Sequence, residues 1–278
     1  MKGTAPPGAR DEREAAAWVR AMFARVARRY DLANHLLSFN IDRLWRARTV
    51  RRVRPILERP GARVLDICCG TGDLTLALAR ACPTPAFSPS GRACPAPAPH
   101  PCRGEACLAL ARRCGVTVLG SDFCHPMLLA ARGKAIRAGL FEADALRLPL
   151  RDASLDLVTV AFGFRNLANY RAGLAEMRRV LRPGGMAAIL EFSQPPNAVF
   201  AALYHFYSRR ILPTIGGALS GSREAYTYLP ESVRKFPSAE ELAKEMRRAG
   251  FREVRYERFS GGIVALHLGV TPPRRPPA

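Results

Sequence analysis

Apolar residues recur with two different periods along the chain, and the change of period separates a helical N-terminal part from a part in which strands and helices alternate. Between residues 15 and 37, apolar side chains recur at every fourth position and predict one amphipathic helix. These side chains are Trp18, Met22, Val26 and Tyr30. Residues 41–57 repeat the pattern. We therefore expect an N-terminal helical cap over residues 15–60, preceded by a charged, disordered segment over residues 1–14.

From residue 63 onward, short apolar runs alternate with helical patterns. The runs predict strands at 63–67, 116–121, 155–162 and 186–191, with helices at 73–81, 125–137 and 170–181 between them. This alternation favours a parallel sheet with helices on both faces. Near the C-terminus, apolar runs at 251–259 and 263–268 flank Ser260-Gly-Gly262, and so tight a turn requires an antiparallel hairpin. We expect a single α/β domain over residues 15–270, followed by a Pro/Arg tail at 271–278.

Residues 83–107 interrupt the strand–helix alternation. Six prolines between Cys82 and His100 exclude a helix or an inner strand there. We interpret the segment as a disordered insertion, with the helix resuming at 108–114. Five of the eight cysteines fall between residues 82 and 114, but without the paired C-x-x-C spacing of a zinc site. We expect reduced thiols and no metal.

The formal charge of +20 allows a nucleic-acid or an anionic membrane partner. Because 39 of the 43 basic residues are Arg, a general preference for Arg explains the excess at least as well. No nucleic-acid motif accompanies the charge. No secretory segment and no apolar run of membrane-spanning length is present. We expect a cytoplasmic protein that binds the inner face of the membrane peripherally.

A glycine-rich turn follows the first predicted strand and suggests a nucleotide site. The strand contains Asp66, and Gly70, Thr71 and Gly72 lead into a helix whose free N–H groups can face a ligand. Dinucleotide sites carry a third glycine, which is missing here. A carboxylate at Asp66 would repel a pyrophosphate but suits the cationic amino-acid end of S-adenosylmethionine. Asp66 could instead only order the loop.

Further aspartates lie at or just after the carboxyl ends of the next predicted strands. Asp122 ends the second predicted strand, where a carboxylate can accept both ribose hydroxyl hydrogens. Asp144 and Ala145 follow the third strand region and could meet the adenine. Each feature alone is weak because strand-end aspartates are common in turns. Their order along the chain is what favours S-adenosylmethionine.

Several longer stretches resemble the C-methyltransferase family of menaquinone and ubiquinone biosynthesis. They are Tyr30-Asp-Leu-Ala-Asn34 with Ser38, Asp42-Arg-Leu-Trp45, Val64-Leu-Asp-Ile-Cys-Cys-Gly-Thr-Gly-Asp73, Ala161-Phe-Gly-Phe-Arg-Asn166, Val180-Leu-Arg-Pro-Gly-Gly185, Glu191-Phe-Ser193, Leu212-Pro-x-Ile-Gly216, Tyr226-x-Tyr-Leu-x-Glu-Ser232 and Gly262-Ile-Val-Ala-Leu-His267. The resemblance covers roughly residues 15–82 and 108–269. It implies a class I methyltransferase (Rossmann-like) fold, with a mostly parallel seven-stranded sheet and an antiparallel C-terminal hairpin.

The resemblance also implies the cofactor and its contacts. S-adenosylmethionine would be bound by Thr71, Asp122 and the pair Asp144 and Ala145. A further family contact, often a Ser, falls on Ala161, which has no hydroxyl. The insertion enters the loop after the first helix of the sheet, at the edge opposite the ligand crevice, so we expect it to spare the site.

The implied substrate is a polyprenylated quinol, methylated on a ring carbon. Only the reduced ring is electron-rich enough for that reaction. Arg165 is the candidate to stabilise a phenolate, with Asn166 and Tyr30 as further catalytic candidates. The ring pocket would be lined by Phe162, Tyr226 and Tyr228. As an alternative, Arg165 forms a salt bridge near Asp152 and Asp156. We assign no catalytic role to His35, His125, His205 or His267.

Several alternatives stay open at this stage. The enzyme could methylate another small acceptor, or the chain could be a non-catalytic member of a quinone-biosynthesis complex; a dinucleotide oxidoreductase is disfavoured. The sequence does not distinguish a naphthoquinol from a benzoquinol, nor a homodimer from a complex with other quinone-biosynthesis enzymes. The apolar helix expected at 200–212 is either a core helix or a lipid-facing lid for the polyprenyl tail.

The insertion yields a first prediction. Replacing residues 83–106 with a short Gly/Ser linker should leave folding and activity nearly intact, because a Pro-rich polar segment contributes no packed core. Thermal unfolding and methyl-transfer assays check this. A shortened protein that fails to fold, or that loses a metal detected by elemental analysis, would show that the segment is structural.

Overall fold

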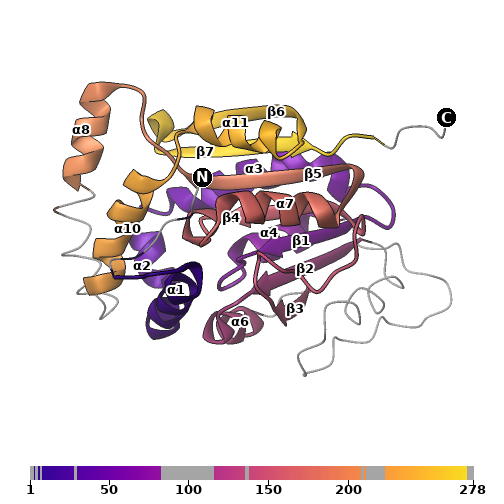
Figure 1. Cartoon of the computed structure of the whole chain (residues 1–278), viewed down its shortest axis with the longest axis horizontal. Coiled ribbons are helices and arrows are strands. Elements are labelled where there is room, and N and C mark those ends of the chain that lie inside the picture. Colours follow the sequence, from indigo (N-terminus) through magenta and orange to yellow (C-terminus); the bar gives the residue numbers. More distant parts are fainter. Residues whose placement is uncertain are drawn as a thin grey trace.

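A seven-stranded sheet forms the centre of the computed structural model, which describes residues 3, 6, 8–27, 30–82, 116–134, 138–207, 210 and 223–273 (Figure 1). The strand order is β3-β2-β1-β4-β5-β7-β6. The strands are β1 (Arg63–Ile67), β2 (Thr117–Asp122), β3 (Gly139–Glu142), β4 (Leu155–Ala161), β5 (Leu181–Phe192), β6 (Arg252–Phe259) and β7 (Val264–Val270). Strands β1 to β5 pair in parallel, whereas β7 runs antiparallel to β5 and β6. The predicted sheet and C-terminal hairpin are confirmed.

Helices cover both faces of the sheet, as the sequence predicted. The helices are α1 (Glu12–Val26), α2 (Tyr30–Leu37), α3 (Ile41–Leu57), α4 (Asp73–Ala81), α6 (His125–Arg132), α7 (Tyr170–Val180), α8 (Ala198–Phe206), α10 (Arg223–Lys235) and α11 (Ala239–Arg248). Leu65 of β1 packs in one core with α7 and α11. The neighbouring Val64 packs in the other core with α3, α4 and α6. Alternate side chains of one buried strand thus serve two helical layers.

The helices α1, α2, α8 and α10 gather at one end of the sheet (Figure 1). The prediction of one continuous helix over residues 15–37 is wrong, because α1 ends at Val26 and α2 begins at Tyr30. Val26 packs against Cys124 and Met127, and the rings of Phe23 and Tyr30 meet edge-on at 5.8 Å. The apolar spacing continues from α1 into α2. The sequence pattern therefore gave no sign that the helix ends between them.

The first helix also begins earlier than predicted. It starts at Glu12, because Asp11 serves as its N-cap and accepts a hydrogen bond from the Glu14 N–H at 2.8 Å. The expected disorder of residues 1–14 is therefore wrong for the last three of them. The Gly3 N–H also donates to the carbonyl of Ala168 at 2.9 Å.

Strand β5 begins at Leu181, earlier than the strand predicted at 186–191, so it includes the Arg-Pro-Gly-Gly stretch of residues 182–185. Leu155 pairs with Leu181 but Leu157 pairs with Met186, so residues 182–185 bulge out of the ladder. Gly184 makes this possible with a φ of 75°. The helix predicted at 41–57 is confirmed, whereas the expectations for residues 83–107, 108–114 and 274–278 lie outside the described residues.

The segment that carries the insertion connects α4 to β2. Its flanking residues, Cys82 and Val116, lie at the end of α4 and just before the start of β2, so they lie at the amino edge of the parallel strands. Over the part of the chain that the structure describes, no helix has both the length and the apolarity needed to cross a membrane.

Two aspartates test the contribution of burial to the fold. Buried Asp156 accepts a hydrogen bond from the Arg63 N–H at 2.7 Å and pairs with Arg182 at 2.8 Å. Asp156→Ala should lower the free energy of unfolding by about 1–3 kcal/mol, because it leaves a backbone donor without a partner. Asp152, whose side chain is 77% exposed, pairs with Arg179, and Asp152→Ala should cost less than about 1 kcal/mol. Urea denaturation measures both, and equal losses would contradict the assignment.

Candidate active site

A cavity of about 780 Å³ lies where the carboxyl ends of the parallel strands meet the helical cap. This volume lies in the range of small-molecule sites. Most of the predicted site residues line it, namely Tyr30, Asp66, Gly70, Thr71, Asp122, Asp144, Ala145, Ala161, Phe162, Arg165 and Asn166. Gly72 and Tyr228 are not among its lining residues, and the side chain of Tyr226 lies outside the described part. The structure therefore brings together residues that are more than 130 positions apart in the chain.

The floor of the cavity is formed by two loops in very close contact. In the loop after β1, Cys68, Gly70 and Gly72 have φ values of 50°, 55° and 80°. Gly72 is the N-cap of α4, so its role is in the turn and not in the cavity wall. A Cβ on Gly163, in the loop after β4, would lie 2.4 Å from the Cβ of Cys68. Gly163 therefore has to be a glycine for the two loops to meet, a role that sequence reasoning missed.

Asp122 is buried and oriented by backbone donors. The Gly70 N–H donates to its Oδ2 and the Cys124 N–H to its Oδ1, both at 2.8 Å. Burial raises the pKa of Asp122 to about 6, against the effect of these hydrogen bonds. Each carboxylate oxygen still has a lone pair for another donor. The carboxylate at the end of β2 is thus fixed beside the glycine turn with capacity for two ligand hydroxyls.

Asp66 lies at the bottom of the cavity and is held by two hydroxyl groups. Thr75 donates to its Oδ2 at 2.7 Å and Thr159 to its Oδ1 at 2.8 Å. Burial raises the pKa of Asp66 to about 7. These contacts connect Asp66 to α4 and to β4, which gives it a structural role besides the predicted ligand contact. Because it also lines the cavity, a cationic ligand group nearby would favour its ionised form.

The glycine turn is bound to the cap by a network of charged residues. Thr71 donates its hydroxyl hydrogen to Asp31 of α2. Lys134 pairs with Asp31 at 2.7 Å and with Asp73 at 2.5 Å, and it donates to the Thr71 hydroxyl at 3.2 Å. The predicted cofactor contact Thr71 is therefore part of a network that joins the turn to α2 and to the residues after α6.

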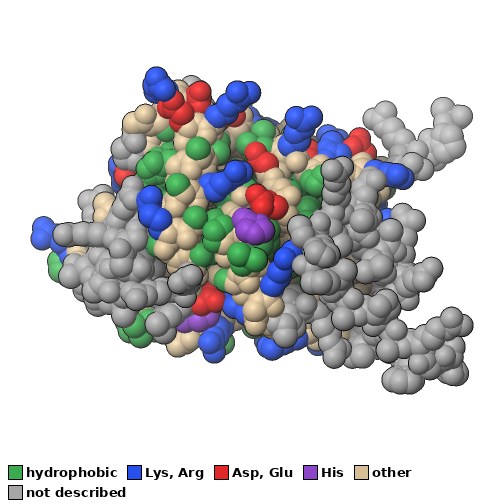
Figure 2. Space-filling view, turned by 90° about the horizontal axis from the view of Figure 1, so that it is seen from below, with side chains coloured by type: hydrophobic (Ala, Val, Ile, Leu, Met, Phe, Trp, Pro, Cys, Tyr) green, Lys and Arg blue, Asp and Glu red, His purple; other side chains and the backbone are tan. Residues whose placement is uncertain are grey.

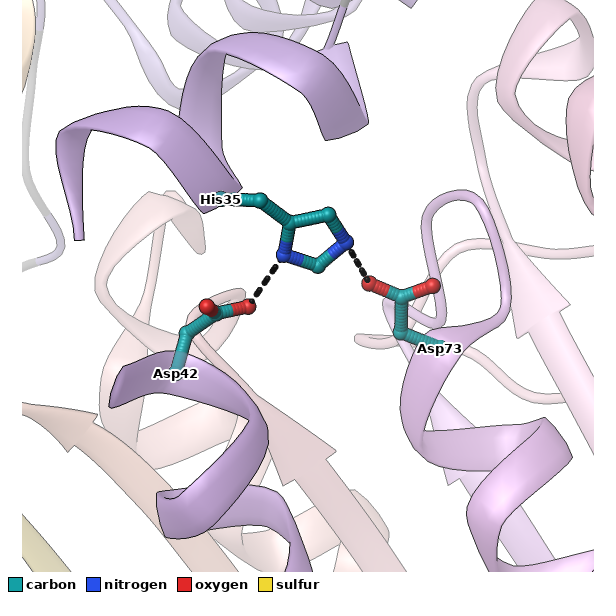
Figure 3. A group of neighbouring side chains, drawn as sticks. All are labelled: His35, Asp42 and Asp73. Atoms are coloured by element: carbon teal, nitrogen blue, oxygen red, sulfur yellow. Dashed lines mark hydrogen bonds and ion pairs between the residues drawn. The ribbon is translucent and has the colours of Figure 1, made fainter. Parts of the chain in front are cut away.

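His35 extends this network, as Figure 3 shows. Its Nδ1 lies 2.8 Å from Asp42 of α3 and its Nε2 lies 3.6 Å from Asp73 of α4, so the imidazole points between two carboxylates from different helices (Figure 3). The ligand atoms lie within 4.8 Å of one another, close enough for a metal ion. Because Arg46 also pairs with both carboxylates, we interpret the group as an ion-pair network and not as a metal site.

Arg165 is 4% exposed and forms the most buried ion pair of the cavity wall. Its Nη1 donates to Glu191 Oε1 at 2.8 Å and to the carbonyl of Phe162. The backbone N–H of Arg165 donates to Glu191 Oε2 at 3.1 Å. The alternative salt bridge to Asp152 or Asp156 is wrong, because these acids pair with Arg179 and Arg182. Burial favours the neutral guanidine, but Glu191 outweighs it and raises the pKa of Arg165. Its Nε is buried without a hydrogen-bond partner.

Three tyrosines, from α2, α8 and α10, lie within the electrostatic influence of this cation. Burial raises the pKa of Tyr30, and it raises the pKa of Tyr204 and Tyr228 to about 12, so all three stay protonated at neutral pH. Tyr228 donates to Asn166 Oδ1 at 3.2 Å from behind the cavity wall, so it supports Asn166 rather than lining the pocket. Tyr204 of α8 lines the cavity but was missed by sequence reasoning. Its apolar helix gave no signal that this residue is special.

An aromatic wall completes the side of the cavity next to Arg165. The rings of Phe162 and Phe192 lie 4.8 Å apart, and Trp45 lies 5.9 Å from Phe162. The guanidinium of Arg165 lies 5.1 Å from the centre of the Phe192 ring. A planar ring bound here would meet aromatic faces and one buried cation. Glu191, like Phe192, lies near the carboxyl end of β5, the same signal that identified Asp122.

The lining residues fit S-adenosylmethionine better than a dinucleotide. Asp66, Asp122 and Asp144 line the cavity where β1, β2 and β3 end. This negative charge suits a cationic nucleoside and disfavours a pyrophosphate. Gly70 and Thr71 of the glycine turn and Ala145 after β3 line the same cavity.

This strand order and this arrangement of glycine turn and strand-end acid define a class I S-adenosylmethionine-dependent methyltransferase. A solved S-adenosylmethionine-dependent methyltransferase of Thermotoga maritima, a possible histamine N-methyltransferase, shares the fold with a TM-score of 0.57 and 17% identity, over 90% of this chain and 98% of that one. The chain belongs to the ubiE/COQ5 methyltransferase family, whose model matches residues 9–271.

Curated relatives extend the similarity over nearly the whole chain. The demethylmenaquinone methyltransferase of Thermus thermophilus is 44% identical over 255 residues, which are 90% of this chain and 100% of that protein. The enzyme of the same name from Deinococcus radiodurans is 41% identical over 95% of this chain and 96% of its own length.

The geometry of Asp122 generates a prediction about cofactor affinity. Asp122→Ala should weaken S-adenosylmethionine binding by about 2–3 kcal/mol, the scale of charge-assisted hydrogen bonds. Because the ionised carboxylate is the acceptor and its pKa is about 6, wild-type affinity should fall as the pH decreases through 6, and Asp122→Asn should abolish this step. Asp152→Ala, at an exposed carboxylate that does not line the cavity, is the matched control. Calorimetry showing wild-type affinity in a folded Asp122→Ala protein would remove Asp122 from the site.

Proposed function

We propose that this protein transfers a methyl group from S-adenosylmethionine to a ring carbon of a demethylmenaquinol, the reduced form of a polyprenylated naphthoquinone. The observation that carries the proposal is Arg165, a buried cation on the cavity wall beside the ring of Phe192. Its fixed positive charge suits the oxygen of a ring substrate bound against the aromatic wall. The names of the relatives at 44% and 41% identity support the naphthoquinol as the acceptor.

The roles of the residues follow from the chemistry of the acceptor. S-adenosylmethionine, when bound, supplies a methyl group already activated by the sulfonium charge, so the protein has mainly to position the reactants. A ring carbon is nucleophilic only when a neighbouring oxygen pushes electron density onto it. Arg165 stabilises that oxygen as a phenolate by its fixed positive charge, and it is not a base because guanidinium stays protonated. The ring carbon that takes up the methyl group releases its proton to solvent, which restores the aromatic ring.

Neighbouring residues hold the two reactants. Asn166 binds the second ring oxygen, with its own side chain held by Tyr228. Phe162 packs against the ring, and Tyr30 closes over it from α2, within the electrostatic influence of Arg165. The cofactor side comprises Gly70, Thr71, Asp122, Asp144, Ala145 and Ala161, together with Asp66 beneath the cationic end.

Two other acceptors are consistent with the same cavity. A benzoquinol of ubiquinone biosynthesis carries the same reduced ring chemistry, and the matched family includes COQ5 in its name. A different small phenol is the second alternative. Supplying demethylated naphthoquinol and benzoquinol with labelled S-adenosylmethionine distinguishes the acceptors, and absence of turnover on any acceptor would indicate a non-catalytic role in a quinone-biosynthesis complex.

The redox state of the acceptor gives the central prediction. The reduced quinol should be methylated, and the oxidised quinone should be inert because its carbonyls withdraw density from the ring. Arg165→Leu should lower turnover about 10²-fold or more, with S-adenosylmethionine affinity little changed, and Arg165→Lys should restore only part because Lys lacks the planar fork. Mass spectrometry of products from dithionite-reduced and oxidised acceptor measures these effects.

Arg171→Leu is the control, because Arg171 pairs with Glu245 on the exposed side of α7 and does not line the cavity. Equal rates on quinol and quinone would contradict the proposed nucleophile. A fully active Arg165→Leu protein would transfer the stabilising role to Asn166 or Tyr30.

A further inference from the structure

Large apolar side chains are exposed around one end of the cavity. They belong to α8 and to the corner between α2 and α3, and we call them the apolar rim. The rim residues and their exposed fractions are Leu36 (50%), Phe39 (74%), Leu44 (60%), Val199 (81%), Leu203 (63%) and Phe206 (60%). Exposed apolar side chains that are grouped in this way, rather than scattered singly, mark an interaction surface.

A hydrogen bond connects the end of α8 to the corner between α2 and α3, and an unusual backbone conformation exposes that corner. The Tyr207 hydroxyl, directly after α8, donates to the carbonyl of Leu37 at 2.9 Å. Phe39 and Asn40 have φ values of 52° and 59°. Asn tolerates this left-handed conformation, but for Phe it is strained, and such strain is retained where it serves a function. The two consecutive residues form the corner that exposes Phe39.

The rim is continuous with the interior of the cavity. Phe39, Leu203 and Phe206 are highly exposed and also line the cavity, so apolar surface continues from the outside of the protein to the inside. Leu36, Leu44 and Val199 contribute only to the outside. An apolar chain attached to a bound ring would therefore meet apolar contacts along the whole path to the surface.

The charges near the rim favour an anionic partner. Between residues 193 and 210 the sequence contains no acidic residue, and Arg210 is exposed just beyond α8. In the corner, Arg43 is exposed next to Leu44, whereas the acid Asp42 is buried and paired with Arg46. A second copy of this chain would also carry a charge of +20 and would be repelled.

We propose that the apolar rim inserts into the interfacial region of an anionic lipid bilayer, so that the prenyl chain of the acceptor passes from the bilayer into the cavity without crossing water. This inference rests on the proposed function, which supplies a membrane-held acceptor. On the face drawn in Figure 2, Lys and Arg are dispersed among other side chains and form no single patch. Dispersed charge attracts the protein to the surface, and the rim determines which end faces the lipid.

Vesicle flotation tests the surface with variants that leave the cavity wall untouched. Leu36→Ser, Leu44→Ser and Val199→Ser, combined, should lower partitioning onto phosphatidylglycerol vesicles about tenfold or more, because each removes apolar area from the contact. Leu129→Ser is the matched control, since Leu129 is 51% exposed on α6, outside the rim, and should leave partitioning unchanged. Higher salt or neutral phosphatidylcholine vesicles should weaken wild-type binding.

A turnover assay separates this inference from the proposed function. The triple variant should methylate a demethylated naphthoquinol without a prenyl chain at the wild-type rate, but should be about tenfold slower on a long-chain acceptor embedded in vesicles. The inference would be overturned if the folded triple variant bound vesicles as well as the wild-type protein. It would also be overturned if the wild-type protein did not bind anionic vesicles at low ionic strength. Loss of a wild-type dimer in the triple variant, measured by analytical ultracentrifugation, would reassign the rim to self-association. Vesicle binding that depends on the rim, without turnover of either quinol, would contradict only the proposed function.

Discussion

The ion pair between Arg165 and Glu191 joins the chemistry of the cavity to the sheet. A guanidinium removed from water is tolerated only where a carboxylate and further acceptors offset the cost of its burial. Glu191 accepts from both the side chain and the N–H of Arg165, so the short helix after β4 is bound to the end of β5. The parallel pairing of β4 with β5 brings these two positions together. The guanidinium of Arg165 is consequently oriented by the register of two neighbouring strands.

The glycine turn depends in the same way on the pairing of β1 with β2, two strands further along the sheet. Asp122 at the end of β2 accepts the Gly70 N–H from the turn after β1, which pairs with β2 in parallel. The turn after β1 also packs against Gly163 in the loop after β4. The close contact between Gly163 and Cys68 therefore places the glycine turn beside the loop that carries Arg165. The two ends of the cavity share this wall.

The helical cap is joined to the glycine turn after β1 by charged side chains. Asp31, His35, Asp42 and Arg46 from α2 and α3 meet Asp73 and Lys134 below them. Partly exposed ion pairs are individually weak. Side-chain ion pairs thus connect the cap to the glycine turn, and the cap carries part of the apolar rim on its outer side.

Local patterns in the sequence were sufficient to predict the class of sheet, the position of the glycine turn and the strand-end acids. These features depend on local periodicity and on which residues tolerate a turn, and both are visible in neighbouring residues. Three features became visible only in the tertiary structure. They are the helix break before Tyr30, the pairing of Arg165 with Glu191 rather than with Asp152 or Asp156, and the position of Tyr228 behind Asn166, outside the cavity lining. The tertiary structure also decided the meeting of α8 with α2 that forms the rim. Each of these depends on contacts between residues distant in the chain, and local periodicity carries no information about which distant side chain will offset the burial of a charge or turn a helix.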